Sequence, residues 1–68
     1  MTNTEIENTK AFQSLDKTTQ IIYGRKAMMD EVKKEFGIAK EIGIERYNDL
    51  YNPRPYKLRV IKELLNHV

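Results

Sequence analysis

The chain has 68 residues, 12 Lys and Arg against 10 Asp and Glu, a formal net charge of +2 and no cysteine. Such a length holds one domain at most, and the lack of cysteine excludes disulfides and cysteine-based zinc sites. No apolar run approaches a membrane span, and the polar N-terminal stretch differs from a signal peptide, so we expect a cytoplasmic protein with no membrane partner.

The first 13 residues are expected to form a short helix or a frayed arm. Thr4 and Glu7 have the spacing of a capping box, and Ile6 supplies an apolar contact. The Asn-Thr pair that follows favours a helix poorly, so both alternatives stay open. We treat residues 1–68 as one small helical domain.

A long central helix is predicted to end at Phe36, with Gly37 as its natural stop. Apolar residues recur every seven positions along it, at Leu15, Ile22, Met29 and Phe36. This spacing is typical of one helix face, and it favours a core stripe over a dimer seam, because a few heptads containing Met and Phe are a weak coiled-coil signature. Gly24 interrupts the run and predicts a bend or a close helix crossing. Glu31 and Glu35 are placed on the opposite, solvated face.

The chain after Gly37 predicts two short helices and a longer final one. Residues 38–42 and 45–51 are separated by Gly43, which can adopt the positive φ of a tight turn. Asn52 and the two prolines after it end the second helix and begin the last, over about residues 55–67. No stretch alternates with the period of a strand, so the predicted fold class is an all-α bundle of three to five helices.

The predicted core consists of apolar positions that recur at helical spacing. They are Leu15, Ile22, Met29, Val32, Phe36, Ile38, Ile42, Ile44, Leu50, Leu58, Ile61 and Leu65. The apolar faces are broad for so small a domain, which leaves a homodimer or another protein partner open.

No set of side chains is typical of catalysis. The single histidine, His67, is next to last, nucleophilic cysteine is absent, and no serine has a histidine and a carboxylate around it. The glycines lack the spacing of a phosphate-binding loop. We therefore expect a protein that is not an enzyme and holds no cofactor or metal.

Residues 38–52, "IAKEIGIERYNDLYN", carry the clearest functional signal. This segment resembles the helix-turn-helix of repressor- and excisionase-type DNA-binding proteins. Ala39 is small enough for two helices to cross closely, Gly43 makes the turn, and Ile44 follows it. The resemblance implies that the second helix, 45–51, lies in the major groove.

The same resemblance implies a set of nucleic-acid contacts. Arg46 and Asn48 are the candidates for base edges, since Arg pairs with guanine and Asn with adenine. Independently of the resemblance, the ring of Tyr51 can stack on a base, support a partner surface or cap the small core with its hydroxyl in water. The expected phosphate contacts, which set register rather than sequence, are Arg54, Lys57 and Arg59.

A second resemblance covers more of the chain. The order of "DEVKKEFGIAKEIGI", "YNDL" and "RVIKELL" is similar to that of the α/β-type small acid-soluble spore proteins. That similarity implies a cysteine-free chain that coats DNA through two helices and folds on binding. Both resemblances depend on the same "IAKEIGI" step.

Two functional hypotheses follow from the sequence. The first is a small DNA-binding protein, a regulator or an architectural factor, that uses the helix-turn-helix-like corner. The second is a protein-interaction module that inhibits or assembles a larger protein machine through its apolar helix faces. The corner favours the first hypothesis, and the modest net charge of +2 favours the second.

Overall fold

A computed structural model describes residues 2–67 and shows six helices in this range, with no strand among them. The helices are α1 (Asn3–Glu7), α2 (Lys10–Gln13), α3 (Lys17–Tyr23), α4 (Lys26–Ile42), α5 (Ile44–Tyr51) and α6 (Pro55–Asn66). The predicted all-α bundle is confirmed. The helices outnumber the three to five predicted because two stretches expected to be single helices are each divided, while the separate helix predicted over 38–42 is wrong and forms the end of α4.

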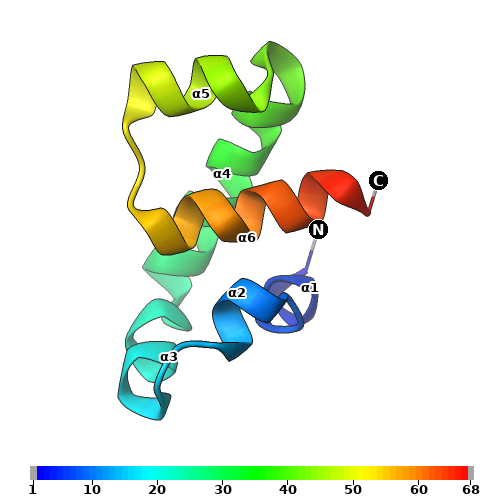
Figure 1. Cartoon of the computed structure of the whole chain (residues 1–68). Helices are drawn as coiled ribbons and strands as arrows, with labels where there is room; N and C mark the ends of the chain where they lie inside the picture. The colour runs from blue at the N-terminus through cyan, green and yellow to red at the C-terminus, as the bar shows by residue number, and fades with distance from the viewer. Residues whose placement is uncertain (1, 68) are drawn as a thin grey trace.

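The longest helix, α4, joins the two ends of the molecule, which measures 31 × 23 × 19 Å along its principal axes. Figure 1 shows α3 at one end of α4 and α5 at the other, with α6 crossing between α5 and the pair α1–α2. α6 packs against α2, α4 and α1. It is therefore the element that ties the N-terminal helices to the rest of the chain.

The N-terminal stretch folds as two short helices. The capping box forms at Thr2 and Glu5, two residues earlier than predicted: Glu5 N–H donates to Thr2 Oγ1 at 3.3 Å, and Thr2 N–H donates to Glu5 Oε1 at 3.0 Å. Both motifs have the same spacing, and the structure uses the one that begins α1 at Asn3. Ile6 and Phe12 are buried in the core.

The central helix predicted to end at Phe36 is divided, and its predicted stop at Gly37 is wrong. α3 ends at Gly24, where a Cβ atom would lie 2.9 Å from the Gln20 carbonyl oxygen. The bend predicted at Gly24 is therefore confirmed, and it needs a residue without a side chain. α4 continues through Gly37 to Ile42, since Gly37 is exposed and costs only its poor helix propensity, about 1 kcal/mol.

The turn predicted at Gly43 is confirmed. Gly43 has φ 94°, accessible at little cost only to glycine, and it is the single residue between α4 and α5. Asn52 ends α5 in the left-handed region with φ 45°, which asparagine tolerates better than most residues. Pro55 then occupies the first turn of α6, where its missing N–H costs nothing.

The predicted core is right for α4 and α6 and wrong at two positions. Met29, Val32 and Ile61 are buried, but Ile22 is 44% exposed and Leu50 is 68% exposed. The break at Gly24 separates α3 from the face that α4 buries, so α3 has no buried residue. α5 packs through Tyr47, which is fully buried, and Leu50 lies off that face. The other predicted core residues are partly buried around the core: Leu15, Phe36, Ile38, Ile42, Ile44, Leu58 and Leu65.

Candidate nucleic-acid interface

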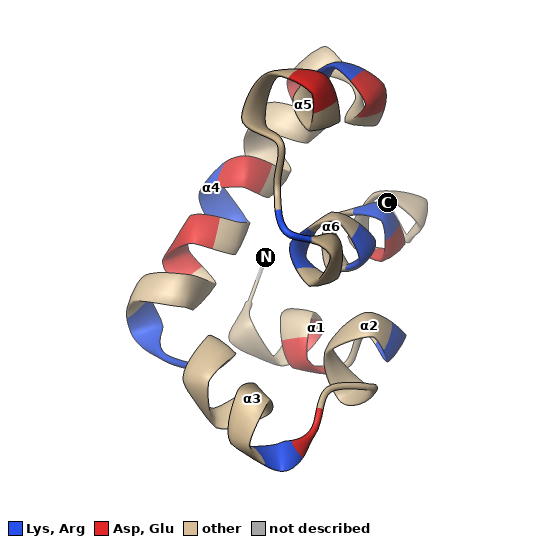
Figure 2. Cartoon of the chain, turned by 60° about the vertical axis from the view of Figure 1, so that its left-hand side comes forward, with Lys and Arg blue, Asp and Glu red and all other residues tan. Residues whose placement is uncertain are grey.

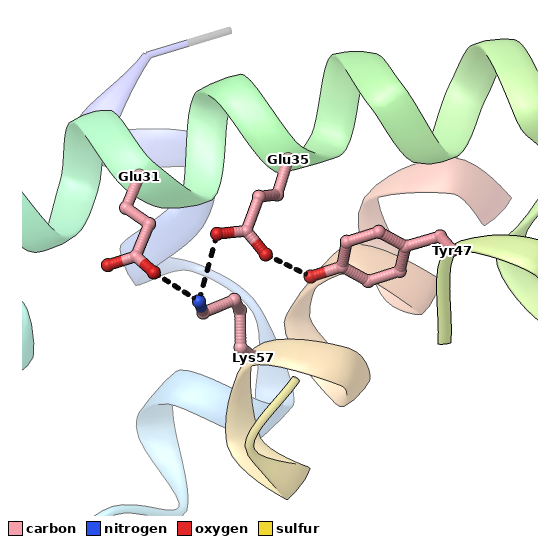
Figure 3. A network of polar contacts seen from close by, with 4 residues as sticks. All are labelled: Glu31, Glu35, Tyr47 and Lys57. Carbon is pink, nitrogen blue, oxygen red and sulfur yellow. Dashed lines mark hydrogen bonds and ion pairs between the residues drawn. The ribbon is translucent and has the colours of Figure 1, made fainter. Parts of the chain in front are cut away.

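An internal polar network joins α4, α5 and α6. Lys57 Nζ lies 2.6 Å from Glu31 Oε1 and 3.0 Å from Glu35 Oε2, and the Tyr47 hydroxyl donates to Glu35 Oε1 at 2.6 Å. Figure 3 shows all four side chains converging from the three helices. Glu31 and Glu35 are four residues apart on α4, so both can reach the same ammonium group.

The Lys57 side chain is 10% exposed, and Glu35 is 11% exposed. Burying an unpaired ion costs several kcal/mol of folding free energy. Here the two buried charges, Lys57 and Glu35, are paired with each other. Glu35 was placed on a solvated face from the sequence. That prediction is wrong because α6 supplies a lysine opposite it.

The network shifts the pKa values of its members. The hydrogen bond from Lys57 lowers the pKa of Glu31 below its ordinary value of 4.5. Burial opposes the charge on Lys57, but the hydrogen bonds to Glu31 and Glu35 outweigh it and raise the Lys57 pKa above 10.5. Burial, followed by the hydrogen bond to Glu35, raises the pKa of Tyr47 far above 10. At neutral pH Lys57 and Glu31 are therefore charged, and Tyr47 is neutral.

Lys57 therefore leaves the set of phosphate contacts expected from the sequence. Its ammonium group is held by the buried carboxylate of Glu35 and the half-exposed carboxylate of Glu31, so it is not free to contact a phosphate. The four-residue spacing of Glu31 and Glu35 indicates that both could contact one cation. The sequence does not show which cation, because Lys57 lies 26 positions from Glu31 and 22 from Glu35. Only the packing of α6 on α4 brings them together.

The outward face of α6 is basic. The exposed residues of this helix are Pro55, Arg59, Lys62 and Asn66, and the exposed Arg54 caps its N-terminus. Pro55, Arg59, Lys62 and Asn66 are three or four residues apart and share one side of the helix, whereas Arg54 precedes the helix as its N-cap residue. Figure 2 shows the basic residues of this segment in blue on and beside α6. Lys62 was not among the predicted contacts, although it lies one turn from Arg59.

The single carboxylate of α6, Glu63, is turned away from this face. Its Oε2 accepts the N–H of Lys10 at 2.7 Å, and its Oε1 accepts the N–H of Ala11 at 2.7 Å. These are N–H groups of the first turn of α2, which no carbonyl within the helix can satisfy. Glu63 thus fixes α2 to α6, and it leaves Arg54, Arg59 and Lys62 without an acidic neighbour on the outward face of α6.

The structure does not bring the two predicted base contacts together. Arg46 and Asn48 are both exposed on α5, but residues two apart lie about 160° apart around a helix. Arg46 instead lies between the exposed carboxylates Glu45 and Asp49 in sequence. Tyr51 is 48% exposed, and its ring stacks on Tyr47 with centroids 5.3 Å apart.

A second tyrosine pair joins α6 to α3. Tyr56 stacks on Tyr23 of α3 with ring centroids 3.8 Å apart, and its hydroxyl is buried with no hydrogen-bond partner. Burial, with smaller contributions from Tyr23, Glu31 and Glu35, raises the pKa of Tyr56 to about 12. Tyr56 thus acts as a packing residue between α3 and α6.

The comparisons with known proteins return no relative: no family model, curated protein or solved structure matches the chain. Within residues 2–67, no group of three or more His, Cys, Asp or Glu side chains could hold a metal ion. In the same range no helix is both long and apolar enough to cross a membrane.

Proposed function

We propose that this protein binds duplex DNA through the outward face of α6, with Arg54, Arg59 and Lys62 on the phosphates. The observation that carries the proposal is the separation of charge across this helix. Its three outward basic side chains are exposed, and the carboxylates of the neighbourhood, Glu63 and the pair on α4, are engaged in internal contacts.

The charge available to a ligand is more basic than the formal net charge indicates. Of 12 basic and 10 acidic residues, one lysine and three glutamates take part in the internal contacts. Eleven basic and seven acidic side chains remain outside them, a formal surplus of four. A basic surplus of this kind, to which the α6 segment contributes three exposed cations, favours a polyanionic partner.

The spacing of the basic row suits a phosphate backbone. Arg54 and Lys62 are eight residues apart, which is about 12 Å along a helix. Each DNA strand carries one phosphate per about 3.4 Å of helix axis, so the row spans several phosphates. Arginine also fits phosphate oxygens with two parallel hydrogen bonds.

The proposal assigns the protein an architectural role and no base-reading helix. Arg46 and Asn48 do not share a face of α5, and two carboxylates flank Arg46. Phosphate contacts position a protein on DNA but carry no sequence information. We therefore expect similar affinity for unrelated duplexes of equal length.

Fluorescence anisotropy with a mixed-sequence duplex tests the proposal. Three phosphate contacts predict a log–log salt slope of about −2.7, so affinity falls about 40-fold between about 50 and 200 mM salt. Arg59→Ala reduces the slope by about 0.9 and the fall to about 12-fold. Lys34→Ala, an exposed lysine on the outward face of α4, is the matched control and leaves the slope unchanged.

Two results would overturn the proposal. One is no binding at the lower salt concentration. The other is an equal loss of slope in Arg59→Ala and Lys34→Ala, which would mean that diffuse net charge, and not the α6 row, attracts the DNA.

A protein-interaction module is the second candidate, and a different observation favours it. Among residues 2–67, four large apolar side chains are exposed: Ile21 at 66%, Ile22 at 44%, Leu50 at 68% and Tyr51 at 48%. Exposed apolar residues gathered in patches mark sites of association more often than scattered ones do. Absence of DNA binding together with a mass that rises with protein concentration would favour this candidate.

A further inference from the structure

The exposed apolar residues form two patches at opposite ends of the molecule. Ile21 and Ile22 are adjacent on α3 and are called here the α3 patch; Leu50 and Tyr51 are adjacent on α5 and are called the α5 patch. Both views place α3 at one end of α4 and α5 at the other. α3 has no fully buried residue: Tyr23 stacks on Tyr56 of α6, whereas Ile21 and Ile22 remain exposed.

The charges around the two patches are opposite. Residues 16–26, around the α3 patch, contain three basic side chains and one acidic one, a formal +2. Residues 41–51, around the α5 patch, contain one basic and three acidic side chains, a formal −2. Glu7 also belongs to the α3 end, since it lines a shallow depression with Lys17 and Ile21. Even with Glu7 included, the α3 end stays positive.

We infer that the α3 patch of one copy of this chain docks on the α5 patch of a second copy. The occupant is a second copy because the chain itself presents both complementary surfaces. Contact between two α3 patches, or between two α5 patches, would oppose like charges. Contact between unlike patches joins apolar residues with opposite charges around them.

Unlike patches at opposite ends give a head-to-tail contact. Such a contact leaves one free patch at each end of every assembly, so it forms open chains unless the rotation between copies closes a ring. The outward basic row of α6 lies on neither patch, so DNA binding and assembly are compatible. The inference does not depend on DNA binding.

The size of the ends predicts a weak association. The two shorter dimensions of the molecule are 23 and 19 Å, so an end can cover about 400 Å² per partner. That is about half of a standard interface and falls in the range of transient complexes. We expect assembly at protein concentrations of about 0.1–1 mM, with little below about 10 μM.

Sedimentation equilibrium without DNA tests the inference, using Ile21→Gln and Leu50→Gln. Both side chains are mostly exposed, and glutamine keeps charge and helix propensity, so folding is retained. Wild type is expected to exceed the 16 kDa of a dimer of 8.0 kDa chains without a plateau as concentration rises. Each variant alone is expected to associate at least tenfold more weakly.

An equimolar mixture of the two variants is the decisive arm. Ile21→Gln keeps a working α5 patch, and Leu50→Gln keeps a working α3 patch, so the mixture is expected to regain association and to stop at the dimer. The control Thr4→Gln, exposed on α1, is expected to behave as wild type. A wild-type mass that stays at 8.0 kDa overturns the inference, as does a wild-type plateau at the dimer or a mixture that stays monomeric.

Discussion

Lys57 and Arg59 lie two residues apart in α6, but one faces the interior and the other faces solvent. The Lys57 side chain is 10% exposed and contacts two glutamates of α4, whereas Arg59 is exposed and has no carboxylate on its face of the helix. The sequence shows two similar cations in the same segment. Their environments separate a charge that stabilises the fold from one that is available to a ligand.

The largest expected loss of free energy of unfolding follows substitution of Lys57, on the side of α6 that faces the interior. Lys57→Met leaves Glu35 buried without its cation, and removing one member of a buried ion pair costs about 3 kcal/mol. Arg59→Met, the matched change two residues away, is expected to cost less than about 0.5 kcal/mol. Urea unfolding followed by circular dichroism measures both free energies, and similar values for the two would contradict the inward–outward division.

The double variant Lys57→Met/Glu35→Gln sharpens this prediction. A neutral glutamine removes the uncompensated charge and can still accept the hydrogen bond from Tyr47. We expect at least half of the lost free energy of unfolding to return. No recovery would mean that packing of the lysine chain, and not its charge, explains the loss.

Substitution of Glu63, which joins α6 to α2, is expected to cause the next largest loss of free energy of unfolding. Glu63→Ala leaves the N–H groups of Lys10 and Ala11 without their acceptor, and we expect a cost of about 2 kcal/mol in the free energy of unfolding. Glu63→Gln, with one acceptor oxygen, should cost about half as much. Hydrogen exchange of the two amides locates the loss, and unchanged protection in Glu63→Ala would contradict the assigned contacts.

Alkaline pH should lower the free energy of unfolding through the titration of buried groups around the polar network. Unfolded tyrosine loses its proton near pH 10, while Tyr47 keeps it because burial and Glu35 raise its pKa. Above pH 10 the unfolded state therefore binds fewer protons, and the free energy of unfolding falls as pH rises, by up to about 1.4 kcal/mol per pH unit for this one group. Tyr56 adds to the fall between pH 10 and about 12, and Lys57 adds to it above 10.5.

Tyr47→Phe is the control for that pH dependence, because phenylalanine does not titrate. The variant should show a shallower fall between pH 10 and 12, measured by urea unfolding at each pH. Glu31 has the opposite sign: its pKa is lowered, so its contribution is present above pH 4.5 and is lost as pH falls below that value. An equal alkaline slope in both proteins would contradict the role of Tyr47.

The smallest effects distinguish the two buried hydroxyls at neutral pH. Tyr47→Phe removes a hydrogen bond to Glu35 and is expected to cost about 1 kcal/mol. Tyr56→Phe removes a buried hydroxyl that has no partner and is expected to be neutral or slightly stabilising. Thermal unfolding of the two variants should shift the midpoint in Tyr47→Phe only.

Much of the backbone could be predicted from the sequence, because local chemistry determines it. The turn at Gly43 and the start of α6 at Pro55 follow from the φ values that glycine and proline accept. The choice between Gly24 and Gly37 could not be predicted in the same way. Both interrupt a helical pattern, and only the close Gln20 carbonyl distinguishes Gly24.

The candidate site was predicted less well, because periodicity gives the faces of a helix but not their neighbours. Arg54 and Arg59 are exposed as expected, while Lys57 is held by glutamates far away in sequence. Arg46 and Asn48 were grouped by their chemistry, although two-residue spacing separates them around α5. The helix-turn-helix resemblance of this corner stays a prediction.

The most direct test of the central claim compares two double variants for DNA affinity at about 50 mM salt. Arg59→Ala/Lys62→Ala removes two charges from the outward face of α6, and Lys26→Ala/Lys34→Ala removes two exposed charges from α4. The account predicts that only the first variant loses DNA binding, by at least tenfold, while both retain the wild-type free energy of unfolding. Equal losses in the two variants would contradict it.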